Sequence, residues 1–505
     1  MTSPTNGASA GAPALRVVIA GAGVSGLTTA YRLQKAGKTK GGRPIEVTLL
    51  ESRDRLGGNI RTERHGQYVI DGGPDAWVTA KPHASALARE LGLGDRLLGT
   101  TAENRRVLVL DKGRLHPFPE GMLLTIPTQV MPFLKTRLLS PFGKIRAGFD
   151  FILPRRTDPS DESIASFVRR RFGSEVLRKI GGPLLGGVFA GDVEQLSIRS
   201  TFPQLVELEA KHRSLILGAR ADMKKRAEAA KKAAIEGGSS GAGAPGGGKP
   251  KTPPSVFHSF PGGLGEFAQA LSKKVEEDGA TIRKNTKVTR VERTDGAARF
   301  RVYAEGAEGP FTIDADAVVM ATPGYVSAEA LKELDREMAE TLRAVPYGSS
   351  VVLGMAYPRA NVAHALNATG IITTDKPDVP IMAVTFLSSK WANRAPEDGA
   401  LFRVFMGGPG REDTLSMSDA TLSSIAEKEL AKLVGTRGSP SFVRVYRHER
   451  ASAQPTLGHD MRVKRVRERE AQVPGLYVVG ASMDGVGIPD CVRQANDLAK
   501  RIVEA

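Results

Sequence analysis

The sequence is nearly free of cysteine and contains no long apolar run. A single cysteine, Cys491, stands among 505 residues, which excludes an intramolecular disulfide and a cysteine-based zinc site, and we expect no metal site. No apolar run approaches the ~18 residues that a membrane-spanning helix needs. The first fourteen residues lack the basic start and apolar core of a secretory signal and the arginines of a transit peptide. They are expected to form a disordered tail.

The sequence has fewer acidic than basic residues: 55 aspartates and glutamates against 71 lysines and arginines, which gives a net charge of +16. Such a balance suggests an anionic partner, which could be nucleic acid, anionic lipid or an acidic substrate, although a generally basic surface would also explain it. Aromatic content is only 6%, and neither a zinc-finger pattern nor an RNP-like motif occurs, so nucleic acid is the least favoured. The length predicts two or more domains.

Residues 15–26, LRVVIAGAGVSG, predict the start of a dinucleotide-binding fold. A buried parallel strand is expected to end at Gly21, which permits a tight turn. Gly23 has no Cβ, so a pyrophosphate can approach the backbone there, and Gly26 allows the following helix to pack close to the strand. The helix N-terminus would then offer free N–H groups to the phosphates.

The segments that follow strengthen this interpretation. Residues 27–35 have helical composition, and residues 46–50 predict a second strand that ends in Glu51, where an acid can accept hydrogen bonds from a ribose hydroxyl. The alternative, a glycine turn in an unrelated loop, does not explain this order of strand, helix, strand and acid.

Further glycine turns favour FAD over NAD. One lies at residues 57–58 and another at 72–73, and residues 480–490 (GASMDGVGIPD) form a third between a buried strand and a final helix. A longer, extended dinucleotide needs backbone approach along its whole length. Ordinary turn chemistry remains the alternative for each turn taken alone.

The composition of the chain changes between these glycine motifs. Residues 121–156 mix apolar residues with lysine and arginine, which suits either an interfacial membrane helix or a core helix with snorkelling basic side chains. Residues 204–235 predict one long helix, and residues 236–254 are low in complexity and predict a flexible loop. A second sheet is expected from strands at 347–356, 381–387 and 401–406, with helices at 326–343 and 418–434.

Several stretches together resemble the protoporphyrinogen oxidases, oxygen-dependent flavoproteins of haem and chlorophyll synthesis. The first two below are shared by all amine-oxidase-like flavoproteins, and the fourth is more particular to this family. They are GAGVSGL (21–27), ESRDRLGGNIRT (51–62), DGGPDAW (71–77), GVFAGDVEQLSIRSTFP (187–203), HSFPGGLGEF (258–267), WANRAPEDG (391–399), PTLGH (455–459) and GASMDGVGIPDC (480–491).

The resemblance implies an α/β fold with three parts. These are a Rossmann-like FAD-binding domain, a mixed-sheet substrate domain and an inserted helical membrane-binding domain. The expected bounds are 15–104, 255–324 and 440–505 for the FAD domain, 105–215 for the helical insertion and 325–439 for the substrate domain.

The resemblance also implies site residues. A substrate propionate would pair with Arg105, and the apolar pocket walls would come from Gly187, Phe189, Tyr325 and Phe386. FAD is expected to bind noncovalently. In monoamine oxidases the cysteine that carries the covalent link lies before the terminal glycine turn, whereas the single cysteine here, Cys491, lies after it. The expected FAD contacts are Gly21, Ala22, Gly23, Val24, Ser25, Gly26, Glu51, Gly57, Gly58, Asn59, Gly73, Pro74, Asp75, Ala76, Val288, Ala481, Val486, Gly487 and Ile488.

Two positions depart from the family pattern. A family arginine before the GVFAG motif is Gly186 here, and the flavin-side GPR becomes Gly73-Pro74-Asp75. The arrangement of charged side chains around the pocket is therefore expected to differ from the family pattern.

The implied reaction is dehydrogenation of protoporphyrinogen IX to protoporphyrin IX, with hydride transfer to FAD, reoxidation by dioxygen and no catalytic side chain. Oxidation of coproporphyrinogen III is the near alternative, and another FAD amine or carotenoid oxidase is a wider one. A GDP-dissociation-inhibitor-like binding protein is the non-enzyme alternative. The implied location is cytoplasmic, on the inner face of the membrane, and a homodimer is left open.

Overall fold

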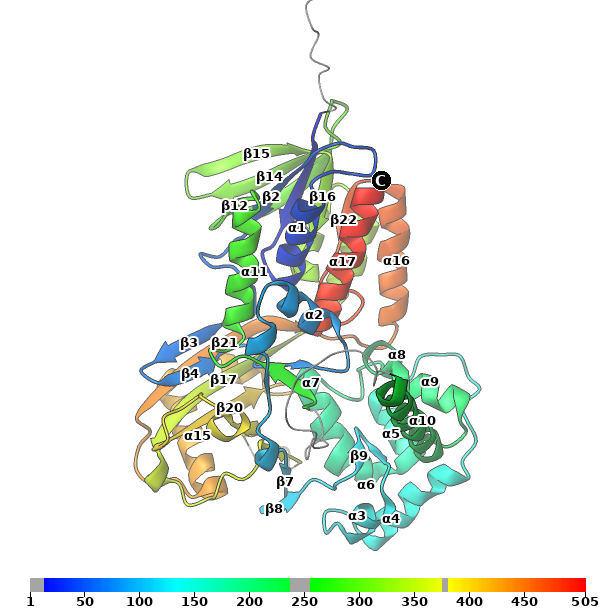
Figure 1. Cartoon of the computed structure of the whole chain (residues 1–505), viewed down its shortest axis with the longest axis vertical. Coiled ribbons are helices and arrows are strands. Elements are labelled where there is room, and N and C mark those ends of the chain that lie inside the picture. Colours follow the sequence, from blue (N-terminus) through cyan, green and yellow to red (C-terminus); the bar gives the residue numbers. More distant parts are fainter. Residues whose placement is uncertain (1–12, 237–254, 375–379) are drawn as a thin grey trace, which may run out of the picture.

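The computed structural model describes residues 13–236, 255–374 and 380–505. Most of the expected N-terminal tail and of the expected loop at 236–254 lies outside these residues. The described chain forms a nucleotide-binding part, a mixed sheet below it and a helical part beside that sheet (Figure 1).

A five-stranded, all-parallel sheet forms the centre of the nucleotide-binding part. Successive residues of its first strand face opposite sides: Val17 and Ile19 belong to one buried cluster, and Val18 and Ala20 to another. Residues 17–20 of this strand are all apolar and buried, because both faces of a parallel sheet are covered. In spatial order the strands are β12 (Thr281–Arg283), β2 (Ile45–Leu50), β1 (Leu15–Ala20), β16 (Ala317–Met320) and β22 (Leu476–Val478).

Helices cover one face of this sheet, and a small antiparallel sheet with further helices covers the other. The first face carries α1 (Val24–Ala36), α11 (Gly265–Glu277) and α17 (Ile488–Glu504), with α2 (His83–Glu90) beside them. The second face carries β13 (Lys287–Arg293), β14 (Phe300–Gly306), β15 (Gly309–Ala315), α12 (Gly324–Leu331), α13 (Arg336–Arg343) and α16 (His459–Gln472).

Among the described residues, the mixed sheet has seven strands, of which only β18 and β7 pair in parallel. Helix α15 (Asp419–Val434) packs on one of its faces. The spatial order is β21 (Phe442–Ala453), β17 (Tyr347–Pro358), β20 (Gly399–Gly407), β19 (Ile381–Phe386), β18 (Gly370–Thr373), β7 (Val107–Asp111) and β8 (Arg114–Pro117). Short pieces join this sheet to the nucleotide-binding part: β3 (Thr62–His65), β4 (Tyr68–Asp71), β5 (Trp77–Val78), β6 (Leu98–Gly99), β11 (Phe257–Ser259) and α14 (Leu387–Lys390).

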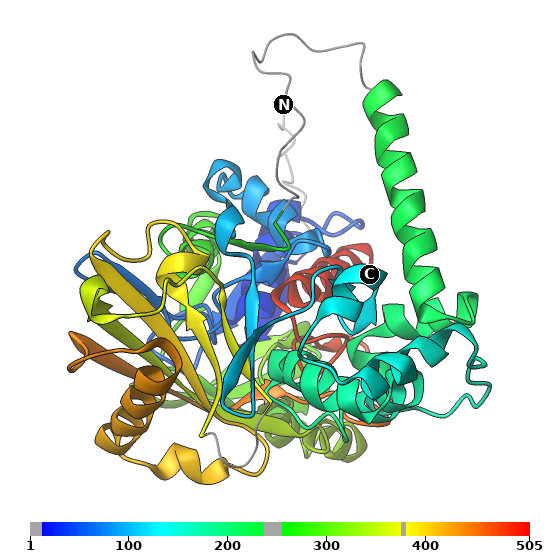
Figure 2. The same cartoon turned by 90° about the horizontal axis from the view of Figure 1, so that it is seen from below.

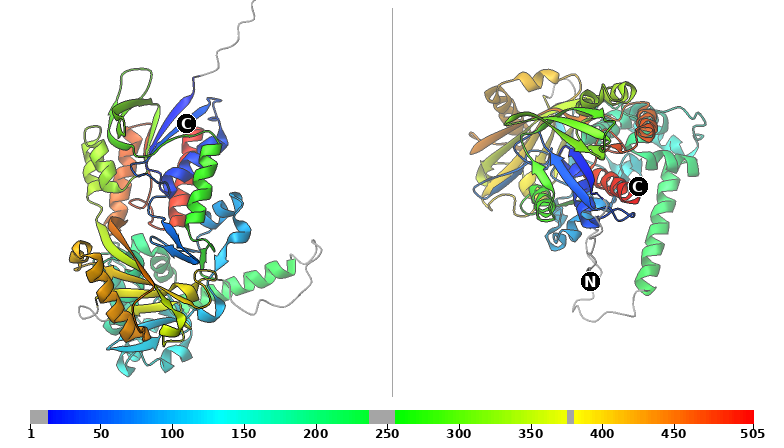
Figure 3. Two further views of the ribbon diagram at one scale, coloured as in Figure 1. Left: turned by 90° about the vertical axis from the view of Figure 1, so that its left-hand side faces the viewer. Right: turned by 90° about the horizontal axis from the view of Figure 1, so that it is seen from above.

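The helical part includes an unusual π-helix, Leu177–Gly186. Helix α10 (Leu215–Glu236) extends away from the rest of the molecule (Figures 2 and 3). The remaining elements are β9 (Met122–Leu123), β10 (Ile126–Pro127), α3 (Val130–Lys135), α4 (Pro141–Gly148), α5 (Ile164–Phe172), α6 (Ser174–Val176), α7 (Gly187–Phe189), α8 (Ile198–Thr201) and α9 (Pro203–Lys211).

Sheet pairing places two segments differently from the expected domain bounds. Strands β7 and β8 belong to the mixed sheet, not to the helical insertion, and so does β21, which was expected in the FAD domain. The reason is that strand partners distant in sequence cannot be read from a local pattern. Two helices expected as single pieces are also split: 204–235 becomes α9 and α10, and 326–343 becomes α12 and α13.

Within the described ranges, no helix combines the length and apolar character needed to cross a bilayer.

Candidate flavin and substrate site

The first glycine turn has the geometry that its sequence predicts. Gly21 has a φ of +98°, and a Cβ there would lie 2.9 Å from the carbonyl oxygen of Ala321, the residue after the neighbouring strand β16. A Cβ on Gly26 would overlap the carbonyl oxygen of Gly21. Both positions therefore require glycine for backbone packing, independently of any ligand.

Gly23 and Gly58 face each other and form an open cradle. A Cβ on Gly23 would meet only the Cα of Gly58, at 4.0 Å, whereas a Cβ on Gly58 would lie 3.0 Å from the Cα of Gly23. Gly23 is the N-cap of α1 and provides no side-chain cap. This open backbone beside a helix N-terminus fits the pyrophosphate of a dinucleotide.

Glu51 fixes the glycine turn from the end of β2. Its buried carboxylate accepts hydrogen bonds from the Ala22 N–H over 2.8 Å and the Arg53 N–H over 2.9 Å. The two turns are also joined directly, because the Gly57 N–H donates to the carbonyl of Ala22 over 2.8 Å. The pairing of Glu51 with a ribose remains a prediction.

The remaining expected flavin residues lie around the same part of the fold. Val288 is buried at a bulge in β13, and the Asn59 amide donates to the carbonyl of Ala451 over 3.0 Å. Gly487 begins α17 without a side-chain cap, so a second helix start offers its amides here. The other members of that turn, Ala481, Val486 and Ile488, are all partly exposed.

The turn at residues 73–76 contacts the mixed sheet through charged side chains. The carboxylate of Asp75 accepts hydrogen bonds from Lys390 Nζ over 2.7 Å and Trp391 Nε1 over 3.0 Å, and lies 3.2 Å from the guanidinium of Arg403. Arg403 also donates to the carbonyl of Gly73. Burial alone would raise the pKa of Asp75, but Lys390 and Arg403 hold that pKa well below its usual range.

Lys390, Trp391 and Arg403 are not among the sequence-predicted site residues. They come from α14, the residue after it and β20, which only the fold brings to the turn. One local signal for these partners was present in the sequence, the change from the family's GPR to Gly73-Pro74-Asp75. An acidic residue in a buried turn needs cationic partners.

Arg105, the expected propionate-binding residue, directly follows a short 3-10 turn at Ala102–Asn104. Its guanidinium donates to the carbonyl of Thr100 over 3.4 Å. The same loop is tied to α14, because the Thr101 N–H donates to the carbonyl of Lys390 over 3.0 Å. The loop that precedes Arg105 is therefore attached to α14, whose last residue, Lys390, contacts Asp75 of the expected flavin turn.

The expected pocket walls divide into three environments. Gly187 is exposed on α7, and Phe189 is buried edge-to-face against Phe202. Tyr325 is partly exposed, with the guanidinium of Arg450 stacked 3.8 Å above its ring. The role of these three residues as pocket walls remains a prediction.

Phe386 does not fit the expected role of a pocket wall. Its side chain is fully buried in the cluster between the mixed sheet and α15, against Phe402. Strand residues alternate between faces, and the sequence does not show which face a helix covers. Phe405, which packs with Arg403 on the opposite face, is partly exposed and is the better candidate.

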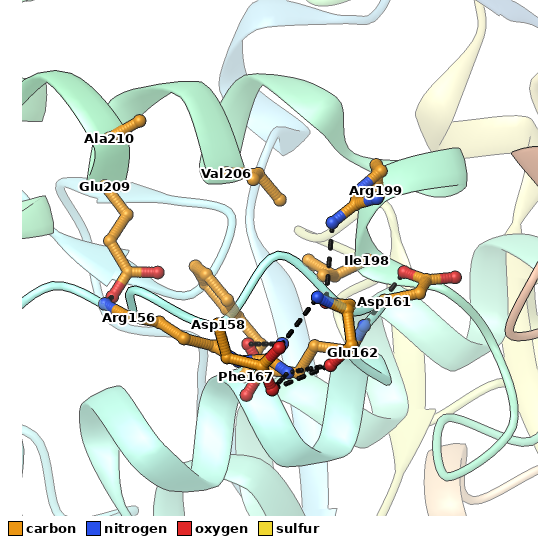
Figure 4. A pocket seen from close by; sticks show the side chains of 11 residues that line it. Arg156, Asp158, Asp161, Glu162, Phe167, Ile198, Arg199, Val206, Glu209 and Ala210 are labelled. Atoms are coloured by element: carbon orange, nitrogen blue, oxygen red, sulfur yellow. Dashed lines mark hydrogen bonds and ion pairs between the residues drawn. The ribbon is translucent and has the colours of Figure 1, made fainter.

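A pocket in the helical part is not this site (Figure 4). Its arginines already have acidic partners: Arg156 pairs with Asp158 and Glu162, and Arg199 pairs with Asp460 outside the pocket. Such a satisfied network leaves no unmatched charge for an anionic ligand.

The fold, the facing glycine turns and the acid at the end of β2 define an FAD-dependent oxidoreductase. The profile of the flavin-containing amine oxidoreductases matches residues 24–503, and the chain belongs to this family. Its cofactor is FAD, as the open cradle at Gly23 and Gly58 allows.

Relatives that match along nearly the whole chain include proteins named as porphyrinogen oxidases. The coproporphyrinogen III oxidase of Bacillus subtilis is 35% identical over 95% of this chain and 96% of that protein. The chloroplastic protoporphyrinogen oxidase of Nicotiana tabacum is 27% identical over 99% of this chain and 88% of that protein. A crystal structure from Exiguobacterium sp. 255-15, assigned as a protoporphyrinogen oxidase, matches with a TM-score of 0.80 and 30% identity over 97% of this chain and 98% of that one.

Proposed function

We propose that this protein oxidises coproporphyrinogen III to coproporphyrin III with dioxygen as the final electron acceptor. The observation that carries this proposal is the similarity along nearly the whole chain to coproporphyrinogen III oxidases, at 35% identity for the B. subtilis protein, against 27% for the tobacco protoporphyrinogen oxidase. The sequence-based expectation placed protoporphyrinogen first, and these relatives favour its near alternative.

The residues of this chain bind and orient, while the bound FAD supplies hydride acceptance and electron transfer to dioxygen. The guanidinium of Arg105 would pair with a propionate of the porphyrinogen. Asp75 stays ionised at neutral pH, because Lys390 and Arg403 hold its pKa below the usual range. Asp75 is therefore not the acid that donates a proton at neutral pH, and the pyrrole proton would leave to water.

Aerobic turnover of purified holoenzyme tests the proposal. We expect bound flavin absorbance and the appearance of coproporphyrin fluorescence from coproporphyrinogen III. A yellow protein that oxidises amines or carotenoids but neither porphyrinogen would contradict the proposal. A flavin-free protein would favour the binding-protein alternative.

We further propose that the protein works in the cytoplasm at the inner face of the membrane. Supporting this, seven large apolar side chains are more than a third exposed along α3, α4 and the 3-10 turn Phe149–Phe151 with the residue after it, at the end of the helical part (Figure 1). Lys135 and Arg137 are exposed beside them, which suits anionic lipid. The seven are Val130, Met131, Leu134, Phe142, Ile145, Phe149 and Ile152.

Sedimentation with vesicles tests this second proposal. Binding should be stronger to phosphatidylglycerol than to phosphatidylcholine, and Phe142→Ser with Ile145→Ser should weaken it. Met461→Ser is the matched control, because Met461 is 62% exposed on α16, outside the helical part. Equal binding by the control and the double variant would contradict the proposal.

A further inference from the structure

Asp75, Lys390 and Arg403 form a largely buried cluster with one net positive charge. The side chains of Lys390 and Asp75 are 14% and 16% exposed, and that of Arg403 is 3% exposed. Within the described chain, Arg403 Nε is buried and has no hydrogen-bond partner. Burying an excess charge is costly, which calls for an explanation beyond stability.

The cluster lies where the nucleotide-binding part meets the mixed sheet. Asp75 belongs to the turn between β4 and β5, whereas Lys390 ends α14 and Arg403 lies in β20. Arg403 also donates to the carbonyl of Gly73, and residues 73–76 are expected to contact FAD. Arg105 follows on the loop that is tied to Lys390. The cluster therefore stands between the expected flavin turn and the expected substrate side.

Fixed charge, not proton transfer, is the chemistry that this arrangement supports. The Asp75 carboxylate accepts hydrogen bonds from Lys390 and Trp391 and forms an ion pair with Arg403, which leaves it a weak base. A flavin that accepts a hydride gains one negative charge. In a low-dielectric surrounding, nearby positive charge favours that reduced form and nearby negative charge disfavours it.

We propose that the Asp75–Lys390–Arg403 cluster sets the reduction potential of the bound flavin, with Lys390 raising the potential and Asp75 lowering it. This inference deepens the proposed function and rests on its flavin chemistry, but it does not depend on which porphyrinogen is oxidised. These three are positioning and tuning residues, since the electrons pass between substrate and flavin.

The midpoint potential of the holoenzyme, measured by dye equilibration without any porphyrinogen, tests the inference. Asp75→Asn should raise the potential, and Lys390→Met should lower it. Lys390→Arg keeps the charge and should stay close to the wild-type potential. The opposite signs are decisive, because loosened packing would not move the potential in opposite directions for the two variants.

Lys432→Met is the matched control for removal of a lysine from an ion pair. Lys432 pairs with Glu429 over 2.7 Å on α15 and is 70% exposed. The flavin potential of the Lys432→Met variant should therefore equal that of the wild type. Shifts of the same sign, or shifts no larger than in this control, would overturn the inference. If Asp75→Asn does not fold, the contrast between Lys390→Met and Lys390→Arg decides alone. If the variants show the predicted shifts in potential but the wild type does not turn over a porphyrinogen, the proposed substrate is refuted and the inference stands.

Discussion

The guanidinium of Arg394 donates to the carboxylate of Asp71 over 2.8 Å, and both side chains are fully buried. Asp71 ends β4 and also accepts the Leu264 N–H over 3.0 Å. Arg394 comes from the segment between α14 and β20, and also donates to Ser259 Oγ over 2.9 Å. This one ion pair therefore fastens the mixed sheet to the loops of the nucleotide-binding part beside the flavin turn.

Arg394→Met should destabilise the fold by about 3–5 kcal/mol, because it leaves the Asp71 carboxylate buried without its cationic partner. Urea unfolding at neutral pH would measure the change. Arg336→Met is the matched control, since Arg336 is 87% exposed in a surface pair with Glu340, and such pairs contribute roughly 0–1 kcal/mol. A similar loss in both variants would contradict this role of Arg394.

Gly23→Val should abolish flavin binding while leaving the chain folded. The new side chain would fill the open cradle opposite Gly58, where the pyrophosphate is expected. The ratio of flavin absorbance to protein absorbance measures the occupancy.

Gly296→Val is the control for that substitution, because no atom lies within 4 Å of a Cβ built at this exposed turn. Full flavin occupancy in the Gly23 variant would refute the placement of the pyrophosphate.

Arg105→Ala should raise the KM for the porphyrinogen by roughly tenfold to a hundredfold, because a charge-assisted hydrogen bond contributes about 1.5–3 kcal/mol. Flavin content should stay unchanged. The neighbouring Arg106 is exposed, and Arg106→Ala should alter KM little. Equal loss of substrate binding and flavin binding in Arg105→Ala would count against its assignment.

His448 should make the fold less stable in mild acid. Burial lowers the pKa of its imidazole, and the hydrogen bond to the Gly72 carbonyl, 2.7 Å long, offsets this only in part. The unfolded chain, with a histidine pKa of about 6.5, then binds more protons than the folded chain as pH falls below that value. Stability is therefore fully present above this pH and decreases towards the lower folded pKa.

His448→Gln removes the titration and should flatten the decline in unfolding free energy between pH 7.5 and 5.5, by at most about 1.4 kcal/mol per pH unit. His116→Gln, on the edge strand β8, serves as the control. An unchanged slope in His448→Gln would show that this imidazole does not contribute.

The glycine motifs predicted the nucleotide-binding fold because each has a backbone reason that is local in sequence. Gly21, Gly26 and Gly58 are constrained by neighbours in adjoining turns, and Glu51 lies at the strand end where its position predicts. FAD followed from the same motifs.

The environment of Asp75 could not be predicted, because its partners lie more than 300 residues away in sequence. Phe386 shows the same limit for pocket walls: its strand alternates as expected, but only the position of α15 decides which face becomes core. The surroundings of Asp75 and Phe386 therefore depended on the fold, whereas the backbone geometry of the first glycine turn followed from the local sequence.

Parallel kinetics of the purified holoenzyme with coproporphyrinogen III and protoporphyrinogen IX, followed by porphyrin fluorescence in air, test the central claim most directly. We predict a higher kcat/KM for coproporphyrinogen III. A higher kcat/KM for protoporphyrinogen IX, or turnover of neither, would contradict the account.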